Sequence, residues 1–315
     1  MITVTVTDIT TETASVKRFS LRRSNGAPFA SYAAGAHVDV TGPGGITRQY
    51  SLCGPPHRTD SYQIAVKRED CSRGGSAALH DQVAVGDELT ISEPRNLFAL
   101  APEADTHVLV AAGIGITPLL SMAYQLSTDG VPYRLHYFAS RREQAAFVRV
   151  LENEMFASSV EFHFGIDRSE QPDVLESILA GAEPGAHVYS CGPKEFMQRV
   201  VEVATRSLPD DQVHIEHFQP LEPTTHEGGE FEVELDTGEV FAIPSGRSIV
   251  EVLGDAGIDV DTSCREGICG TCVLTVLDGV PDHRDNCLTR KEKESGDQIA
   301  TCVSRAKTAR LVLEL

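Results

Sequence analysis

Four cysteines near the end of the chain constrain it more than any other feature of the sequence. Cys264, Cys269 and Cys272 follow a C-x4-C-x2-C spacing, and 29 residues separate Cys272 from Cys302. Plant-type ferredoxins hold a 2Fe–2S cluster by four thiolates in this pattern. A zinc site or unpaired buried cysteines are the alternatives, but structural zinc ligands usually come as two close pairs. The spacing therefore predicts a 2Fe–2S centre.

The residues between these cysteines suit the same centre. Gly267 and Gly270 let the backbone curl, so that N–H groups can point at anionic sulfur atoms. Thr271 offers a hydroxyl donor beside them. Because such a cluster carries one electron at a time, we expect the rest of the chain to supply electrons to it.

Composition sets the class of protein. The 315 residues are enough for two or three domains, and the apolar fraction of 41% is ordinary for a globular protein. No apolar run approaches the roughly 20 residues of a membrane span, and the first residues lack the pattern of a signal peptide. Eight cysteines, four of them scattered, suit a reducing compartment better than a disulfide framework. These features predict a cytoplasmic monomer with no membrane segment.

The charge is strongly negative. The formal net charge of −19 argues against binding to nucleic acid or to an anionic membrane, and it favours a partner with a basic docking face. Residues 223–315 carry 18 acidic and 9 basic side chains, whereas residues 1–222 carry 28 and 18 over more than twice the length. Solubility alone is the alternative explanation for the excess of acid.

Residues 1–101 predict an antiparallel β-barrel. Six short segments with strand character are separated by turn signals, and one short helix is expected at 76–82. The expected strands are 2–9, 14–23, 37–42, 47–54, 62–69 and 87–94.

Residues 102–222 predict an α/β domain with a parallel sheet and helices on both faces, because strand and helix patterns alternate. Strands are expected at 106–113, 133–140, 160–167, 187–193 and 213–218. Helices are expected at 118–126, 143–156, 173–180 and 195–208.

The last part of the chain predicts a small separate domain. Residues 223–230 have no hydrophobic period and indicate a linker. Residues 231–315 begin with a hairpin at 231–243, continue with a helix at 248–257, and end with strands at 272–279 and 309–315.

Two motifs of the barrel region suit a flavin mononucleotide. Arg48 and Tyr50 share one face of a strand and are followed by Ser51, so a cation for phosphate and a flat ring for stacking lie together. The loop 72–76 (SRGGS) precedes a helix, where backbone N–H groups can close on a phosphate. The alternative for the first motif is the alternation of arginine and tyrosine that is common on strand faces. The alternative for the second motif is an ordinary helix N-cap with a loop.

Three motifs of the α/β region lie where strands end. The stretch 112–118 (AGIGITP) offers bare backbone at a helix N-terminus to a pyrophosphate, although a turn without ligand is the alternative. Arg141 follows the second strand, where the ribose of a dinucleotide lies in open α/β sheets, unless it only begins a solvated helix. Cys191 and the following glycine leave room for a nicotinamide ring. Glu216 shares a strand face with His214, and this pattern indicates no metal site.

The order RQYS, SRGGS, GIGITP, CGP and C-x4-C-x2-C…C resembles the phthalate dioxygenase reductase family, which includes vanillate demethylase reductases. The resemblance covers nearly the whole chain, and the stretches 282–289 and 302–306 are especially similar to this family. It implies a multi-domain fold: a flavin β-barrel (1–101), an NAD-binding α/β domain (102–222) and a β-grasp plant-type ferredoxin domain (231–315). Cys287 is a local oddity within 282–289, and we interpret it as a buried bystander beside the ligand Cys302.

The resemblance also implies the site residues. Those expected to bind FMN are Arg48, Tyr50, Ser51, Ala65, Val66, Lys67, Gly74, Gly75 and Ser76. Those expected to line the nicotinamide dinucleotide site are Gly113, Ile114, Thr117, Arg141, Cys191, Gly192 and Pro193. Phe218 is expected to cover a flavin face, and Cys191 and Phe218 are assigned to the catalytic contact.

The implied activity is an NADH-dependent oxidoreductase that passes electrons through FMN and the 2Fe–2S cluster to the oxygenase component of a multicomponent monooxygenase or dioxygenase of the Rieske type. A reductase for a haem monooxygenase and a free diaphorase are alternatives within the same enzyme class. A non-catalytic iron–sulfur sensor is an alternative from a different class, and absence of flavin would distinguish it.

Overall fold

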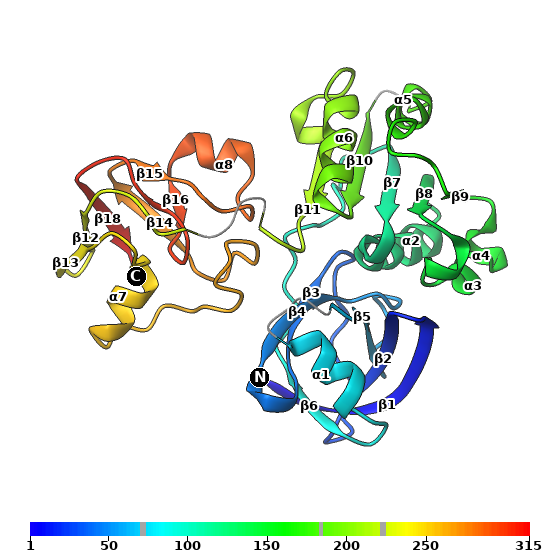
Figure 1. Cartoon of the computed structure of the whole chain (residues 1–315), viewed down its shortest axis with the longest axis horizontal. Helices are drawn as coiled ribbons and strands as arrows, with labels where there is room; N and C mark the ends of the chain where they lie inside the picture. The colour runs from blue at the N-terminus through cyan, green and yellow to red at the C-terminus, as the bar shows by residue number, and fades with distance from the viewer. Residues whose placement is uncertain (70–73, 183–184, 221–224) are drawn as a thin grey trace. The chain divides into compact units, whose positions relative to one another are not determined.

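The computed structural model describes residues 1–69, 74–182, 185–220 and 225–315. These residues form two compact units, Met1–Glu216 and His217–Leu315 (Figure 1). Among the described residues, no helix has both the length and the apolar character that crossing a membrane requires.

The first part of unit 1 is the antiparallel barrel that the turn signals predict. Its six strands pair in the order β4-β3-β6-β1-β2-β5, and every pairing is antiparallel. An antiparallel bridge between Leu52, just after β4, and Ile64 of β5 joins the first and last strands of this order. Beside it, Cys53 N donates to Gln63 O at 2.9 Å. The strands are β1 (Ile2–Thr13), β2 (Val16–Arg23), β3 (His37–Thr41), β4 (Thr47–Ser51), β5 (Tyr62–Lys67) and β6 (Glu88–Ile91).

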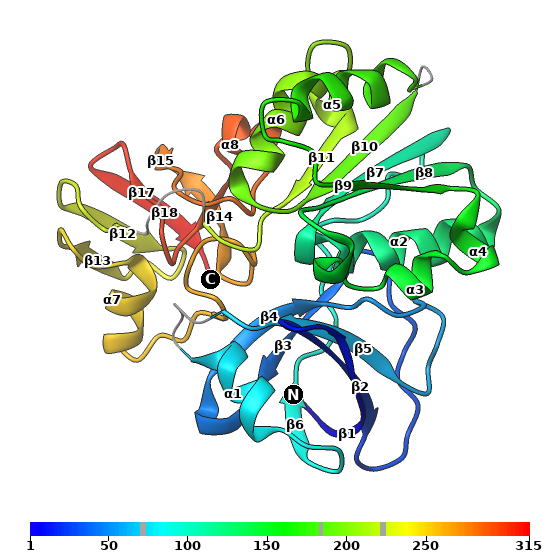
Figure 2. The same cartoon turned by 45° about the vertical axis from the view of Figure 1, so that its right-hand side comes forward.

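Alternating apolar side chains of these strands fill the barrel, among them Val4, Phe19, Val38 and Ile64, each with no solvent exposure. Helix α1 (Gly75–Gln82) follows β5 and lies beside the barrel (Figure 2). Leu79 of this helix joins the barrel core.

The second part of unit 1 is a parallel sheet with the strand order β11-β10-β7-β8-β9. Helix α2 (Ile116–Asp129) lies on one face, and α5 (Gln171–Ala180) and α6 (Lys194–Ala204) lie on the other (Figure 2). The strands are β7 (Thr106–Ala112), β8 (Tyr133–Ala139), β9 (Val160–Phe164), β10 (Ala186–Cys191) and β11 (Val213–Glu216). This confirms the predicted α/β alternation.

The prediction of one continuous helix over 143–156 is wrong. The structure has a short 3-10 turn η3 (Arg142–Gln144) and two single-turn helices, α3 (Val148–Leu151) and α4 (Glu154–Ala157). Phe147 has a left-handed backbone (φ 63°) that no continuous helix tolerates, and its ring is buried against the core. Asn153 has extended backbone and caps α4 by accepting a hydrogen bond from Met155 N at 3.3 Å.

The barrel and the parallel sheet of unit 1 share apolar core and hydrogen bonds. Val16, Ala65 and Phe98 belong to the same buried cluster as the residues that pack α2 on the sheet. Gly35 N donates to Ser121 Oγ at 3.0 Å, and Ala101 N donates to the hydroxyl of Tyr189 at 2.7 Å. Unit 1 is therefore one compact body built from two kinds of sheet.

Unit 2 is a mixed sheet with the order β13-β12-β18-β14-β16 and one long helix, α7 (Ile249–Asp255), packed beside it. This arrangement and the hairpin turn at Gly238 (φ 88°) agree with the predicted β-grasp fold. The strands of this sheet are β12 (Phe231–Leu235), β13 (Val240–Ile243), β14 (Val273–Asp278), β16 (Gln298–Ala300) and β18 (Arg310–Glu314). Two short strands, β15 (Pro281–Asp282) and β17 (Arg305–Ala306), pair with each other as a separate sheet. Helix α8 (Arg290–Ser295) is capped by Thr289 and was not expected.

The described part of the predicted linker, residues 225–230, is hydrogen-bonded within unit 2. Arg284 Nη1 donates to the carbonyl oxygens of Thr225 (3.1 Å) and Glu227 (2.8 Å). Arg305, only 2% exposed, donates to Gly229 O at 3.0 Å and also to the carbonyls of Arg247 and Pro244. Residues 223 and 224 of the predicted linker lie outside the described residues.

Candidate functional site: a four-cysteine loop and two cofactor-binding sheet edges

The four predicted cluster ligands converge in unit 2. Cys269, Cys272 and Cys302 are buried, and their sulfur atoms pair by hydrogen bonds, Cys264 with Cys269 and Cys302 with Cys272. The hydrogen bond from Cys264 lowers the pKa of Cys269 to about 4, and that from Cys302 lowers the pKa of Cys272. Both shifts favour the thiolate, which is the form of cysteine that binds metal. The loop fits the predicted 2Fe–2S cluster.

The local backbone explains why glycine occurs in this loop. Gly267 has φ 71°, and a Cβ there would lie 2.6 Å from Val303 Cγ2 and 3.1 Å from Asp285 Cα. Glu266 N lies 3.3 Å from Cys264 Sγ, so a backbone N–H does point at a ligand sulfur. Thr271 Oγ1 accepts a hydrogen bond from Cys269 Sγ at 3.2 Å, so the hydroxyl does contact a ligand sulfur, although the thiol and not the hydroxyl is the donor.

Cys287 lies near the ligand cysteines without pairing to one of them. Its Sγ donates to Asp285 Oδ2 at 3.6 Å. Burial, then the Asp285 carboxylate and Cys272, raise the pKa of the Cys287 thiol. Cys287 is half-buried rather than fully buried, and its hydrogen bond runs to a carboxylate and not to a ligand sulfur, so the geometry agrees with its assignment as a bystander.

The predicted flavin residues come together where β4 meets the start of α1. Gly75 at the helix N-terminus is so close to Arg48 that a Cβ there would lie 3.1 Å from Arg48 Cγ. Gly74 has φ 92°, which turns the chain into the helix. A guanidinium beside a positive helix end fits a phosphate. Residues 72 and 73 of the predicted SRGGS loop lie outside the described residues.

Other predicted flavin residues have different surroundings. Ala65 and Val66 point to opposite faces of β5, since Ala65 packs against the parallel sheet and Val66 fills the barrel. The carbonyl of Val66 is bound by His80 Nε2 at 2.8 Å. Lys67 Nζ is 2.7 Å from Glu69 Oε1 on the surface. The side chains of these residues therefore do not converge as Arg48 and the glycine turn do.

The predicted nicotinamide residues lie where β7 and β10 end side by side. A Cβ on Gly115 would lie 2.1 Å from Cys191 O, and a Cβ on Gly192 would lie 2.8 Å from Ala112 Cβ. Two strand ends therefore approach closely enough to require glycine on both. Gly113 (φ 57°) has open space in front of its Cα, as a backbone approach to a ligand needs. The edge fits a flat ring and a pyrophosphate.

Two further predicted residues of this edge are polar. Thr117 is buried, and its hydroxyl donates to Ile114 O at 3.0 Å, so it closes the turn before α2. Arg141 is exposed after β8, whereas the neighbouring Arg142 is bound to both carboxylate oxygens of Glu152 at 2.6 and 2.7 Å. Pro193 precedes α6, and Phe218 belongs to unit 2, so its expected contact with flavin stays a prediction.

Glu216 is a candidate that the sequence reasoning missed. It lies beside Cys191 across β10 and β11, and its side chain hydrogen-bonds with Ser51 of the barrel. Part of the side chain is accessible, but Oε2 is buried and has no hydrogen-bond partner among the described residues. Burial raises the pKa of Glu216 to about 8. The hydrogen bond between Glu216 and Ser51 thus connects β11 of the parallel sheet to β4, the strand of predicted flavin residues.

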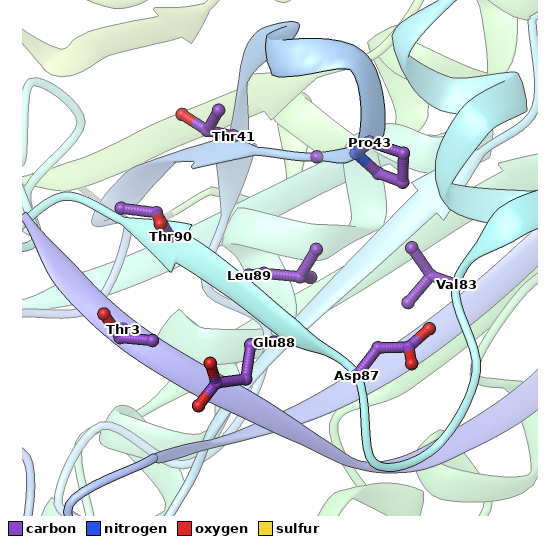
Figure 3. Close-up of a pocket in the computed structure, with 9 residues that line it drawn as sticks. Thr3, Thr41, Pro43, Val83, Asp87, Glu88, Leu89 and Thr90 are labelled. Atoms are coloured by element: carbon purple, nitrogen blue, oxygen red, sulfur yellow. The ribbon is translucent and has the colours of Figure 1, made fainter.

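A cavity of about 450 Å³ on the barrel lies apart from every predicted cofactor residue. Figure 3 shows Thr3 and Thr90 on adjacent strands and the carboxylates of Asp87 and Glu88 at its rim. Asp87 Oδ2 accepts a hydrogen bond from Ala84 N at 2.8 Å. Two carboxylates repel a phosphate, so this cavity does not suit FMN.

Comparison with known proteins supports this arrangement of sites. The 2Fe–2S iron–sulfur cluster binding domain matches residues 233–307, and the N-terminal domain of dimethylamine monooxygenase subunit DmmA-like proteins matches residues 91–213. The vanillate O-demethylase oxidoreductase of Pseudomonas sp. (strain HR199 / DSM 7063) is 44% identical over 93% of each chain. The phthalate dioxygenase reductase of Burkholderia cepacia is 41% identical over 94% of this chain and 92% of its own.

Solved structures agree. The structure of phthalate dioxygenase reductase, described as modular for electron transfer from pyridine nucleotides to a 2Fe–2S centre, has a TM-score of 0.73 at 39% identity, covering 100% of this chain and 98% of its own. An intact type IV self-sufficient cytochrome P450 monooxygenase has a TM-score of 0.89 at 38% identity. This chain is covered completely but spans only 41% of that protein.

Fold and site together define a class, the modular electron-transfer reductases, in which a flavin barrel, a pyridine-nucleotide sheet and a 2Fe–2S domain occur in one chain. The chain belongs to the family of phthalate dioxygenase reductase and vanillate O-demethylase oxidoreductase. It is an oxidoreductase, and its C-terminal part contains a 2Fe–2S iron–sulfur cluster binding domain.

Proposed function

We propose that this chain is the reductase component of a Rieske-type aromatic oxygenase or demethylase, and that the oxygenase component takes electrons from the 2Fe–2S unit. The observation that carries this proposal is the convergence of Cys264, Cys269, Cys272 and Cys302 at one site. Similarity to a vanillate O-demethylase oxidoreductase over 93% of both chains supports the choice of partner.

The proposed division of labour follows from electron count. A flavin accepts two electrons as a hydride from NADH and releases them singly, as a 2Fe–2S cluster requires. Arg48 and the N-terminus of α1 would hold the phosphate of FMN, and Tyr50 with Ser51 would lie along its ring. Gly113, Gly192 and Cys191 would hold the nicotinamide dinucleotide at the sheet edge. Hydride transfer needs no general base, which agrees with the absence of a nucleophile–base pair among these residues.

The acidic surface of the C-terminal residues supports a charged encounter with the partner. Residues 223–315 carry twice as many acidic as basic side chains. Opposite charges on two proteins raise the rate of their encounter, and salt screens them over about 8 Å at physiological ionic strength. We therefore expect reduction of the oxygenase to slow as salt rises, while reduction of a small dye changes little.

The test of the proposed function is a pair of cysteine variants. Cys302→Ser should lose the visible iron–sulfur bands and retain FMN, and it should still pass electrons from NADH to ferricyanide, since that reaction needs only the flavin. Its reduction of the oxygenase should fall by orders of magnitude. Cys287→Ser is the matched control and should keep the cluster and both reactions. A Cys302→Ser protein that drives the oxygenase at the intact rate would contradict the proposal.

A haem monooxygenase is a second candidate partner, because the self-sufficient cytochrome P450 structure contains a region similar to this whole chain. Reconstitution decides between the two. Measured rates of electron delivery to a purified Rieske oxygenase and to a purified haem monooxygenase should favour the Rieske protein, and a preference for the haem protein would reverse the assignment. A free diaphorase would reduce dyes but neither partner.

We further propose that the chain acts as a monomer in the cytoplasm, with boundaries between its domains at 101/102 and in the linker 223–230. The described cysteines Cys53, Cys191 and Cys287 are free thiols, as are the four cluster ligands, and this supports a reducing compartment. Light scattering coupled to size exclusion measures the oligomeric state directly.

A further inference from the structure

A second group of metal-ligating side chains lies in unit 1, on adjacent strands of the parallel sheet. His136 is on β8, and Glu161 and His163 are on the neighbouring strand β9. His136 pairs with Glu161 in the register of the two strands, and His163 follows two residues later on the same face. No residue of the proposed electron-transfer sites belongs to this group.

The ligand atoms of the group face one another. His136 Nδ1 is 3.1 Å from His163 Nε2, and the Glu161 carboxylate lies 3.6 Å from the first of these nitrogens and 3.8 Å from the second. Zinc binds imidazole nitrogen and carboxylate oxygen at about 2.0–2.2 Å, so two ligands of a tetrahedral ion lie roughly 3.3–3.5 Å apart. The two nitrogens and the carboxylate therefore surround a space that fits one small divalent ion with little rearrangement.

The surroundings prepare the two imidazoles to act as ligands. The side chains of both histidines are 10% exposed, and that of Glu161 is 66% exposed, so an ion has a path from solvent. Phe138 stacks on His163 at 4.4 Å and fixes the orientation of its ring.

We propose that His136, Glu161 and His163 form a binding site for one divalent transition-metal ion of the zinc type, which joins the edge strand β9 to β8. Two imidazoles and one carboxylate with an open fourth position suit Zn²⁺, and they suit Ca²⁺ and Mg²⁺ poorly, since these ions prefer oxygen ligands. Water would complete the coordination. The consequence for the protein is a more stable edge of the sheet, because binding to the folded state alone raises its stability.

A second histidine pair in the same sheet provides an internal control. His187 Nδ1 is 2.9 Å from His214 Nε2 on β10 and β11, so it has the same imidazole contact. In the part of the chain that the structure describes, no carboxylate or thiol completes that pair to a group of three ligands. Substitution of His214 therefore removes a comparable histidine contact without removing a ligand of the proposed ion.

The test uses the intact holoprotein, without an affinity tag and after treatment with a chelator. Calorimetric titration with Zn²⁺ should show about one site per chain. In a separate thermal unfolding experiment, the zinc-loaded protein should have a higher midpoint than the metal-free protein. Glu161→Gln, at an exposed position, should weaken binding at least about tenfold, as loss of a direct ligand should cost no less than loss of a supporting residue. His163→Gln should abolish binding, and the control His214→Gln should leave the affinity unchanged.

X-ray absorption at the zinc edge distinguishes this site from zinc bound to thiols. The loaded protein should show imidazole and oxygen neighbours at about 2.0–2.2 Å and no sulfur at about 2.3 Å. A sulfur shell, equal zinc affinity in Glu161→Gln and the intact protein, or no zinc binding at micromolar concentration would overturn the proposal. In the last case the two histidines would be a neutral hydrogen-bonded pair only.

Discussion

Glu216→Gln tests whether a neutral carboxyl group lies between the barrel and the parallel sheet. Burial raises the pKa of Glu216 from 4.5 to about 8 in the folded protein, and its Oε2 has no partner among the described residues. The unfolded chain releases this proton near pH 4.5, and the folded chain keeps it until about pH 8. Stability is therefore highest below pH 4.5 for this group and falls as the pH rises toward 8.

The expected change in the free energy of unfolding follows from the shift in the pKa of Glu216. Each pKa unit corresponds to about 1.4 kcal/mol, so the carboxyl should destabilise the folded state by roughly 3 kcal/mol more at pH 8 than at pH 5. Glutamine has a similar shape and cannot ionise. Glu216→Gln should accordingly remove this part of the pH dependence, and the variant should be the more stable protein at pH 8 but not at pH 5.

The assay is denaturant unfolding of the holoprotein at pH 5, 6.5 and 8, followed by circular dichroism and by the rise of flavin fluorescence on FMN release. The quantity of interest is the difference between intact protein and variant at each pH, because the titration of all other groups cancels in it. Glu202→Gln, on the exposed side of α6, is the control and should give a difference independent of pH. If the difference in stability between the intact protein and Glu216→Gln also did not change with pH, the assignment of a buried neutral carboxyl would be refuted.

Two further predictions concern packing. Gly115→Ala places a Cβ 2.1 Å from Cys191 O, far inside van der Waals contact, so the ends of β7 and β10 must separate; the NADH-dependent reduction of ferricyanide and the thermal midpoint should both fall, while Gly254→Ala, with open space around it in helix α7, should lower neither. Arg305→Lys should lower the stability of unit 2 by about 2–4 kcal/mol, since one ammonium cannot replace the guanidinium that reaches three carbonyls; an unchanged urea midpoint for the iron–sulfur bands would contradict this.

The regular elements were predictable because they obey local periods. Strands of the barrel alternate apolar and polar residues, β7 is an apolar run that ends at Gly113, and the spacing of the cysteines is that of a cluster-binding loop. The helix predicted over 143–156 failed for a local reason as well. Its apolar residues have helical spacing, but Phe147 gains more from filling the core than the backbone loses in the left-handed region.

The candidate site could be predicted from the sequence only where one short motif contains both the functional residues and the turn that positions them. In the sequence Glu216 stands out only because it shares a strand face with His214, and its environment comes from Ser51, which lies 165 residues earlier in the chain. The group of His136, Glu161 and His163 likewise depends on the register of two strands, which cannot be read from the sequence. Contacts between distant segments decide both cases.

The segment 225–230 shows how a polar stretch can be held without an apolar anchor. Its sequence has no hydrophobic period, and from that alone a linker free of the folded units would be expected. In unit 2 its backbone carbonyls accept hydrogen bonds from Arg284 and Arg305, which lie more than 55 residues later. Arg305 also stacks on Phe231, with its guanidinium carbon 5.0 Å from the ring centroid. Because a guanidinium offers five donors in a fixed plane, one buried arginine can bind carbonyls of several segments, and hydropathy patterns do not register such a contact.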